Sequence, residues 1–153
     1  MLRISKLADY GTVVMVYLAK HPQELCNARD IALHTHLAVP TVSKILKRLT
    51  GAGLLSSVRG VTGGYRLQKP ATEISVTQII YALEEHRGFT ECSLQPNECS
   101  LQGVCTVQGN WRVISRAIET ALDSVSLEAL AKPTLHIQDV DRVQQLASGV
   151  NRG

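Results

Sequence analysis

The chain has 153 residues, of which 44% are hydrophobic, which is enough for one small domain with an appendage. Its mean hydropathy lies near zero, so the composition excludes a wholly disordered chain. The longest apolar run, residues 13–19, is too short to span a bilayer and lacks the pattern of a signal peptide. We therefore expect a cytoplasmic protein that has no membrane partner and whose thiols stay reduced.

The net charge of +3 is distributed unevenly along the chain. Residues 1–70 contain ten Lys and Arg against three acidic residues, which gives this segment a charge of +7. Residues 71–153 contain six Lys and Arg against ten acidic residues, which gives −4. A basic segment joined to an acidic one predicts a polyanionic partner for the basic segment.

The spacing of apolar residues predicts three helices in the first fifty residues. His21 and Pro22 end the first helix, and Asn27 can cap the second. The third begins with Pro40 at its first position, where a missing backbone N–H costs nothing, and it closes at Gly51. These helices cover residues 5–20, 28–35 and 40–50.

Two short strands follow the third helix, at 54–58 and 65–67, with a glycine-rich turn at 60–64 between them. Two short helices joined by a tight turn and followed by such a hairpin form a winged helix-turn-helix. The predicted fold class is mostly α, with a two-stranded wing and a long dimerisation helix further along the chain. We expect residues 1–70 to form the DNA-binding domain.

The third helix has an aliphatic inner face, and its outer face is polar and basic, as the major groove requires. Arg48 falls on this outer face. The hairpin brings basic side chains to a narrow ribbon, and its glycines allow close approach to a phosphate backbone or a minor groove. Each feature alone suits an ordinary solvated helix or turn, but their order and the local charge favour DNA. The predicted DNA-binding residues are Thr41, Ser43, Lys44, Lys47, Arg59, Gly60, Gly63, Gly64, Tyr65 and Arg66.

The second half of the chain predicts a short helix at 77–85, a non-periodic segment at 88–107 and a long helix at 107–124. We expect residues 71–132 to form one unit and residues 133–153 a loosely held tail. The apolar stripe of the long helix suits either a core or a dimer seam. We favour a homodimer, because winged-helix proteins usually bind two half-sites. The predicted dimerisation residues are Trp111, Ile114, Ile118 and Leu122.

Three cysteines lie between these two helices in the pattern C-x6-C-x5-C, as Cys92, Cys99 and Cys105. Cys26 stands apart, and we predict a structural role for it. Structural zinc sites use closer pairs and four ligands, and a disulfide would leave one thiol over. A thiol redox switch stays open, but a soft three-thiolate loop suits an iron–sulfur cluster best.

Taken together, these motifs resemble the Rrf2 family of bacterial regulators. The matching features are the opening residues 2–6, the helix-turn-helix, the wing segments 56–60 and 63–65, and the cysteines ahead of a helix that contains Trp111. The resemblance covers roughly residues 1–132. It implies a dimeric winged-helix repressor or activator, and many members hold a 2Fe–2S or 4Fe–4S cluster on the three cysteines. The wing and the third helix look closest to regulators of the SUF cluster-assembly operon.

The resemblance also bears on the fourth cluster ligand. In the cluster-assembly branch, a histidine three residues after the last cysteine can be this ligand, but Gln108 occupies that position here. In the nitric-oxide-sensing branch, an aspartate early in the first helix can bind from the partner subunit, and Asp9 matches it. The alternative role of Asp9 is to offset the positive end of the helix macrodipole. Weaker candidates are Glu98, Glu91 and His86.

The expected function is an iron–sulfur-cluster-sensing regulator that binds double-stranded DNA and represses SUF genes, with 2Fe–2S favoured over 4Fe–4S. The alternatives are a nitric-oxide-sensing repressor with the same cysteines and a cluster-free thiol redox regulator. We expect neither enzymatic activity nor a small-molecule substrate, because the sequence has no Ser-His-acid set and no metal-ligating His pair. The turn at 60–64 joins two strands, which excludes a phosphate-binding loop that opens a helix.

Overall fold

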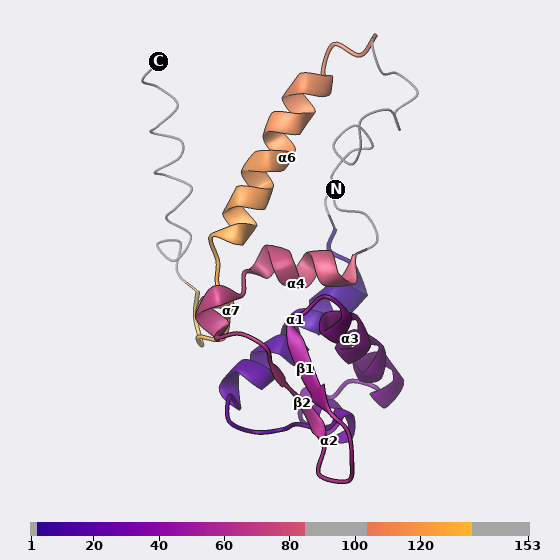
Figure 1. The fold of residues 1–153 in the computed structure, drawn as a ribbon. Helices are drawn as coiled ribbons and strands as arrows, with labels where there is room; N and C mark the ends of the chain where they lie inside the picture. Colours follow the sequence, from indigo (N-terminus) through magenta and orange to yellow (C-terminus); the bar gives the residue numbers. More distant parts are fainter. Residues whose placement is uncertain (1–2, 85–103, 136–153) are drawn as a thin grey trace.

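The structure is a computed structural model, and it describes residues 3–84 and 104–135. It confirms a mostly helical fold with one two-stranded antiparallel sheet (Figure 1). No helix within the described residues is long and apolar enough to cross a bilayer. The elements are α1 (Lys6–Lys20), α2 (Ala28–Thr35), α3 (Val39–Gly51), β1 (Leu55–Val58), β2 (Gly64–Leu67), the 3-10 helix η1 (Ala71–Glu73), α4 (Val76–Leu83), α6 (Gln108–Asp123) and α7 (Leu127–Leu130).

Short polar side chains cap the N-termini of most of the described helices. They accept hydrogen bonds from backbone N–H groups that have no partner within the helix. Ser5 caps α1, and Asn27 caps α2 as predicted, by accepting from the N–H groups of Arg29 and Asp30. Ser75 and Gln78 form a reciprocal capping box at the start of α4. These caps fix where the helices start in the chain.

Several element boundaries differ from the sequence prediction, and one element was not predicted. Pro40 is the second residue of α3, where its missing N–H is still one of the donors that lack a partner in the helix. α4 ends at Leu83, because Glu84 adopts an extended conformation instead of continuing the helix. The 3-10 helix η1 lies in a stretch for which no element was predicted.

The main core lies where α1 packs against α3, α4 and α7. Gly11 makes the contact between α1 and α4 possible, because a Cβ at this position would overlap the side chain of Leu83. Buried residues from both sides of residue 70 share this core, including Met15, Ile45 and Leu127. The division into units at residue 70 stays a prediction.

α6 extends away from this core as a separate rod, with only its last turns close to the winged helix (Figure 1). Its end is held by two backbone hydrogen bonds, from Val76 N–H to the Val125 carbonyl at 2.9 Å and from Leu127 N–H to the Ile74 carbonyl at 2.7 Å. A small second cluster of buried residues lies between α4 and the end of α6, and it consists of Val76, Ile80 and Val125. α4 therefore lies between the main core and α6.

Candidate DNA-binding surface and cysteine site

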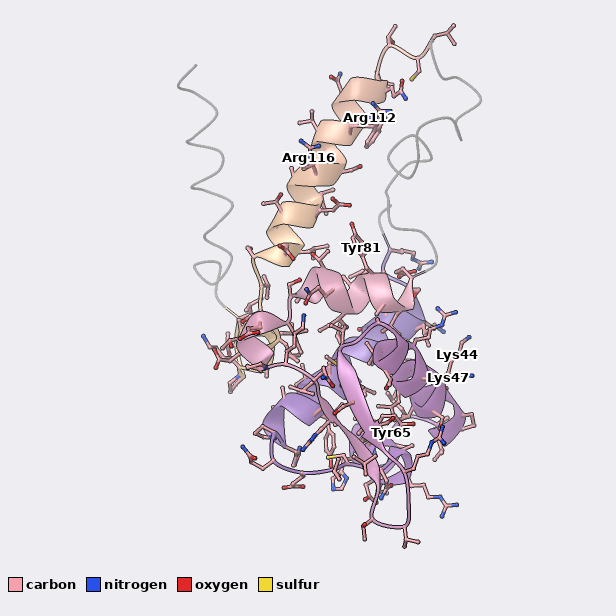
Figure 2. All side chains as sticks on the ribbon, viewed as in Figure 1. Lys44, Lys47, Tyr65, Tyr81, Arg112 and Arg116 are labelled. Atoms are coloured by element: carbon pink, nitrogen blue, oxygen red, sulfur yellow. The ribbon has the colours of Figure 1, made fainter. Side chains whose placement is uncertain are left out.

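α3 separates its apolar and polar residues onto opposite faces. Val42, Ile45, Leu46 and Leu49 are buried on the inner face, as the spacing predicts. Ser43, Lys44 and Lys47 are exposed, and Thr41 is half-buried near the start of the helix. Lys44 and Lys47 point away from the body of the molecule (Figure 2). The outer face of α3 is thus a basic surface of the kind that enters a major groove.

The wing presents a second basic surface at its tip. Arg59 and Arg66 are exposed on the two sides of the hairpin. Gly60 has a φ of +117°, a conformation that strongly favours glycine, and Val61 at the tip is fully exposed. The tip is therefore narrow and carries no bulky side chain that folds back on it, which suits close approach to a nucleic acid backbone.

The predicted DNA-binding residues at the start of β2 lie deeper than those at the tip. Tyr65 is half-buried and exchanges two backbone hydrogen bonds with Cys26, at 3.0 and 2.9 Å. A Cβ on Gly64 would lie 2.9 Å from the backbone of Cys26, and a Cβ on Gly63 would overlap the carbonyl of Val58. Gly64 and Tyr65 hold the wing against Cys26, whereas Gly63 lies close to the opposite strand end of the hairpin. The contact of these residues with DNA stays a prediction.

Cys26 is therefore part of the seam between the wing and α2. Its side chain is 4% exposed, and burial first, then the nearby Glu24 and Asp30, raises the pKa of its thiol. A raised pKa leaves less of the reactive thiolate at neutral pH. This environment agrees with the structural role predicted from the sequence.

The side chain of Arg48 does not have the orientation that helical spacing predicts. Instead of pointing outward with the lysines, it is half-buried, and its Nη1 donates a 2.7 Å hydrogen bond to the carbonyl of Leu83. Glu84 follows, and its Oε1 accepts a 2.8 Å hydrogen bond from the N–H of Ser5. Local sequence patterns do not predict these contacts, because they join residues 35 and 79 positions apart.

Of the predicted cluster ligands, the described residues include Cys105 and Asp9. Cys105 is a half-buried free thiol three residues before α6, and Gln108 is the first residue of that helix. Cys92 and Cys99 lie outside the described residues, as do the weaker candidates Glu98, Glu91 and His86. Within residues 3–84 and 104–135, no three potential ligands lie together. A thiol set of this kind fits a soft metal centre, for which Cys105 would supply one ligand.

Asp9 lies far from Cys105 within one chain. It is exposed in the first turn of α1, whereas the start of α6 is at the end of that rod farthest from the winged helix (Figure 1). A site that combined Asp9 with Cys105 would therefore need Asp9 from a second chain.

The predicted dimerisation residues lie on a face of α6 that is largely exposed among residues 3–84 and 104–135. Trp111 is 41% exposed and Ile114 is 44% exposed, while Ile118 is half-buried. Leu122 is also half-buried, but it packs against the small second cluster near α4. The apolar face of α6 thus has the composition of an interface, and dimerisation through it stays a prediction.

The adjacent face of α6 meets α4 through polar groups. The hydroxyl of Thr77 donates to the Glu119 carbonyl at 3.3 Å, and the hydroxyl of Tyr81 donates to the Glu119 carboxylate. Tyr81 points from α4 toward α6 in Figure 2. Ser75 adds a 2.6 Å hydrogen bond to the carboxylate of Asp123. These directional bonds fix the rotation of α6 and so determine which face is left for a partner.

Comparison with known proteins agrees with this architecture. The family model Rrf2, described as an iron-dependent transcriptional regulator, matches residues 4–133. The HTH-type transcriptional regulator IscR of Photorhabdus laumondii is 34% identical over 130 residues, which cover 84% of this chain and 79% of that protein. The HTH-type transcriptional regulator NsrR of Oceanobacillus iheyensis is 31% identical over 136 residues, which cover 86% and 90%.

A solved structure shows the same fold. CymR, the global cysteine regulator of B. subtilis, superposes with a TM-score of 0.69 at 30% identity, covering 88% of this chain and 99% of that chain. These relatives are transcription regulators, which confirms the expectation that the chain is not an enzyme. The chain belongs to the Rrf2 family of DNA-binding transcription regulators.

Proposed function

We propose that this chain is an iron–sulfur-cluster-sensing transcription regulator that acts in the cytoplasm as a homodimer and represses genes of iron–sulfur cluster assembly of the SUF type. The observation that carries the proposal is the set of three cysteines ahead of α6 in a chain of this family. The similarity to IscR supports a role in transcription regulation, and the choice of target genes rests on the resemblance to regulators of the SUF operon. The cysteines suit a 2Fe–2S cluster, which we favour over 4Fe–4S.

Two basic surfaces carry the DNA-binding part of the proposal. The outer face of α3 would enter the major groove, with Thr41, Ser43, Lys44 and Lys47 toward the bases and phosphates. The wing tip would follow the backbone or the minor groove with Arg59 and Arg66. A two-fold pair of such heads, joined along the apolar face of α6, matches an operator with two half-sites.

The sensing part rests on the thiols. Cys92, Cys99 and Cys105 would hold the cluster, which when bound supplies a centre that is sensitive to iron supply, oxidation and nitric oxide. Asp9 is the proposed fourth ligand, donated by the partner chain, because it is exposed in the first turn of α1. An oxygen ligand is exchanged more readily than a thiolate, which suits a sensor.

The test is anaerobic reconstitution of the purified full-length protein with iron and sulfide. The parent should take up about two iron and two sulfide per chain and gain visible absorption. Cys105→Ser should lose both, and Cys26→Ala is the matched control that keeps them, because Cys26 lies at the wing seam. A parent that binds no iron, or a Cys105→Ser variant that reconstitutes like the parent, contradicts the proposal.

The nitric-oxide-sensing alternative has one specific observation in its favour. Gln108 replaces the histidine ligand of the cluster-assembly branch, while Asp9 is exposed at the position used in the nitric-oxide-sensing branch. Asp9→Ala should shorten the lifetime of the cluster in air if Asp9 is a ligand. Release of DNA by stoichiometric nitric oxide, with no response to iron depletion, would favour this alternative. An iron-free protein whose DNA binding responds to oxidant would instead be a thiol redox regulator.

A further inference from the structure

We propose that Arg48 is a positioning residue that binds the recognition helix α3 to the carboxyl end of α4. We call the contacts of Arg48 with Leu83 and of Glu84 with Ser5 the joint, and we propose that the segment bearing Cys92 and Cys99 acts on α3 through it. The coupling to the cysteine segment rests on the proposed function. The positioning role of Arg48 stands on the described contacts and is tested separately.

The first contact of the joint is between Arg48 and Leu83. The Nη1 of Arg48 lies 2.7 Å from the carbonyl oxygen of Leu83, the last residue of α4. The carbonyls of a final helical turn have no partner within the helix, and the negative end of the macrodipole lies there. A guanidinium group donates a hydrogen bond to such a carbonyl, and its positive charge is stabilised by the negative end of the macrodipole. Hydrogen bonds from charged donors are stronger than those between neutral groups. The contact therefore fixes the orientation of α3 relative to α4.

The second contact fastens the same end of α4 to α1. Glu84 leaves the helix in an extended conformation, and its Oε1 accepts a 2.8 Å hydrogen bond from Ser5, the N-cap of α1. A carboxylate at a helix N-terminus is stabilising, since the positive end of the macrodipole lies there. The side chain of Leu83 also packs directly against Gly11 of α1, where a Cβ would overlap it. One helix end thus binds two other helices.

The position of this joint in the chain gives it a functional meaning. Cys92 and Cys99 follow Glu84 in the sequence, eight and fifteen residues later. The start of α4 is held by backbone hydrogen bonds to the α6–α7 connection, at 2.9 and 2.7 Å. Because α4 is fixed at its start, a displacement of its carboxyl end is transmitted to the helices that this end binds, α3 and α1. Small shifts are transmitted well in a packed core, because its elements move as rigid bodies.

Lys47 is the natural comparator for Arg48. The two are neighbours on α3 and carry the same charge, but Lys47 is exposed and points away from the body (Figure 2). A side chain that neutralises a phosphate contributes about one unit to the slope of log K against log salt. A side chain that only orients the helix changes the affinity for the operator and leaves this slope unchanged. The salt slope therefore separates the two roles.

The experiment measures operator binding by full-length Lys47→Met, Arg48→Met and Arg48→Lys over a range of salt. Lys47→Met should reduce the salt slope by about one. Arg48→Met should lower operator affinity about tenfold, with an unchanged salt slope and unchanged affinity for non-specific DNA. Arg48→Lys should recover part of the loss, because a lysine donor can still approach the carbonyl. Circular dichroism establishes whether each variant is folded. If Arg48→Met does not fold, the operator affinity and salt slope of Arg48→Lys alone are compared with those of the parent. A reduced slope for the Arg48 variants, or parental affinity, overturns the positioning role.

The coupling has its own readout. The ratio of operator affinities between the iron-and-sulfide-loaded protein and the chelator-stripped protein should fall toward one in Arg48→Met, while the visible spectrum stays parental. A parental ratio in Arg48→Met shows that the joint does not carry the signal. If the parent binds no iron, the proposed function fails. The same affinity ratio is then measured between protein with reduced thiols and protein oxidised by diamide. The salt-slope result for Arg48 holds in either case.

Discussion

Gly64 and Gly51 show how strongly the role of a glycine depends on what surrounds it. At Gly64, β2 passes the backbone of Cys26 so closely that a Cβ would lie 2.9 Å from it. At Gly51, the last residue of α3, a Cβ would meet nothing within 4 Å. Because backbone cannot move aside as a flexible side chain does, only the first position requires glycine.

We expect Gly64→Ala to lower the free energy of unfolding by about 1–3 kcal/mol through overpacking at the wing seam. The matched control Gly51→Ala should leave it unchanged or raise it by up to about 1 kcal/mol, because alanine loses less backbone entropy in a helix. Urea unfolding at one fixed protein concentration measures both changes, since dimer stability depends on concentration. Equal effects of the two substitutions would show that the seam does not depend on Gly64.

At this scale the sequence predicts side chains whose position follows from local periodicity and misses those whose position follows from distant contacts. Helical spacing places Lys44 and Lys47 outward, and the structure agrees. The same spacing puts Arg48 beside them, but its long side chain reaches a carbonyl 35 residues away. Gly64 was predicted as a DNA-approach glycine, and only the structure shows the backbone of Cys26 against it.

Among the elements, α6 is the one whose two faces differ most. The face toward α4 is fixed by hydrogen bonds to Glu119 and Asp123, whereas Trp111 and Ile114 lie on a face that stays exposed among the residues the structure describes. If the exposed face is the dimer seam, a charge placed in it loses hydration without gaining a partner. The assembly should then respond to substitutions on this face only.

Ile114→Glu should raise the dimer dissociation constant by at least about tenfold, and sedimentation velocity measures the change. Arg116→Glu is the control, because Arg116 is exposed on α6 outside the apolar stripe and the variant should remain dimeric. A dimeric Ile114→Glu protein would place the interface elsewhere.

Element boundaries were predictable where a local signal sets them and not where a tertiary contact does. Asn27 caps α2 by its own side chain, so the start of that helix could be predicted. α4 was expected to reach residue 85, but Glu84 turns out of the helix and binds Ser5. The exposure of α6 also depends on packing, because the same apolar stripe would suit a buried helix.

For the whole molecule, the positive charge of the first segment of the chain corresponds to a surface. This segment forms α3 and the wing, whose exposed lysines and arginines face away from the core. In the second segment, α6 has two arginines and two carboxylates, and both carboxylates accept hydrogen bonds from α4 or its N-cap. The fold class and the exposure of the basic side chains on α3 and the wing could therefore be predicted from sequence, whereas the joint at the end of α4 could not.

The most direct test of cluster-dependent regulation is the operator affinity of the same protein in two states. An operator is first obtained by selection from random duplex DNA, with the loaded and the stripped protein used separately. Binding is then measured anaerobically, with a Lys44→Ala/Lys47→Ala variant as the control that should bind poorly in both states. The proposed function predicts that the loaded and stripped proteins differ in operator affinity by about fivefold or more. Equal affinities in the two states, or no selected sequence in either, would contradict it.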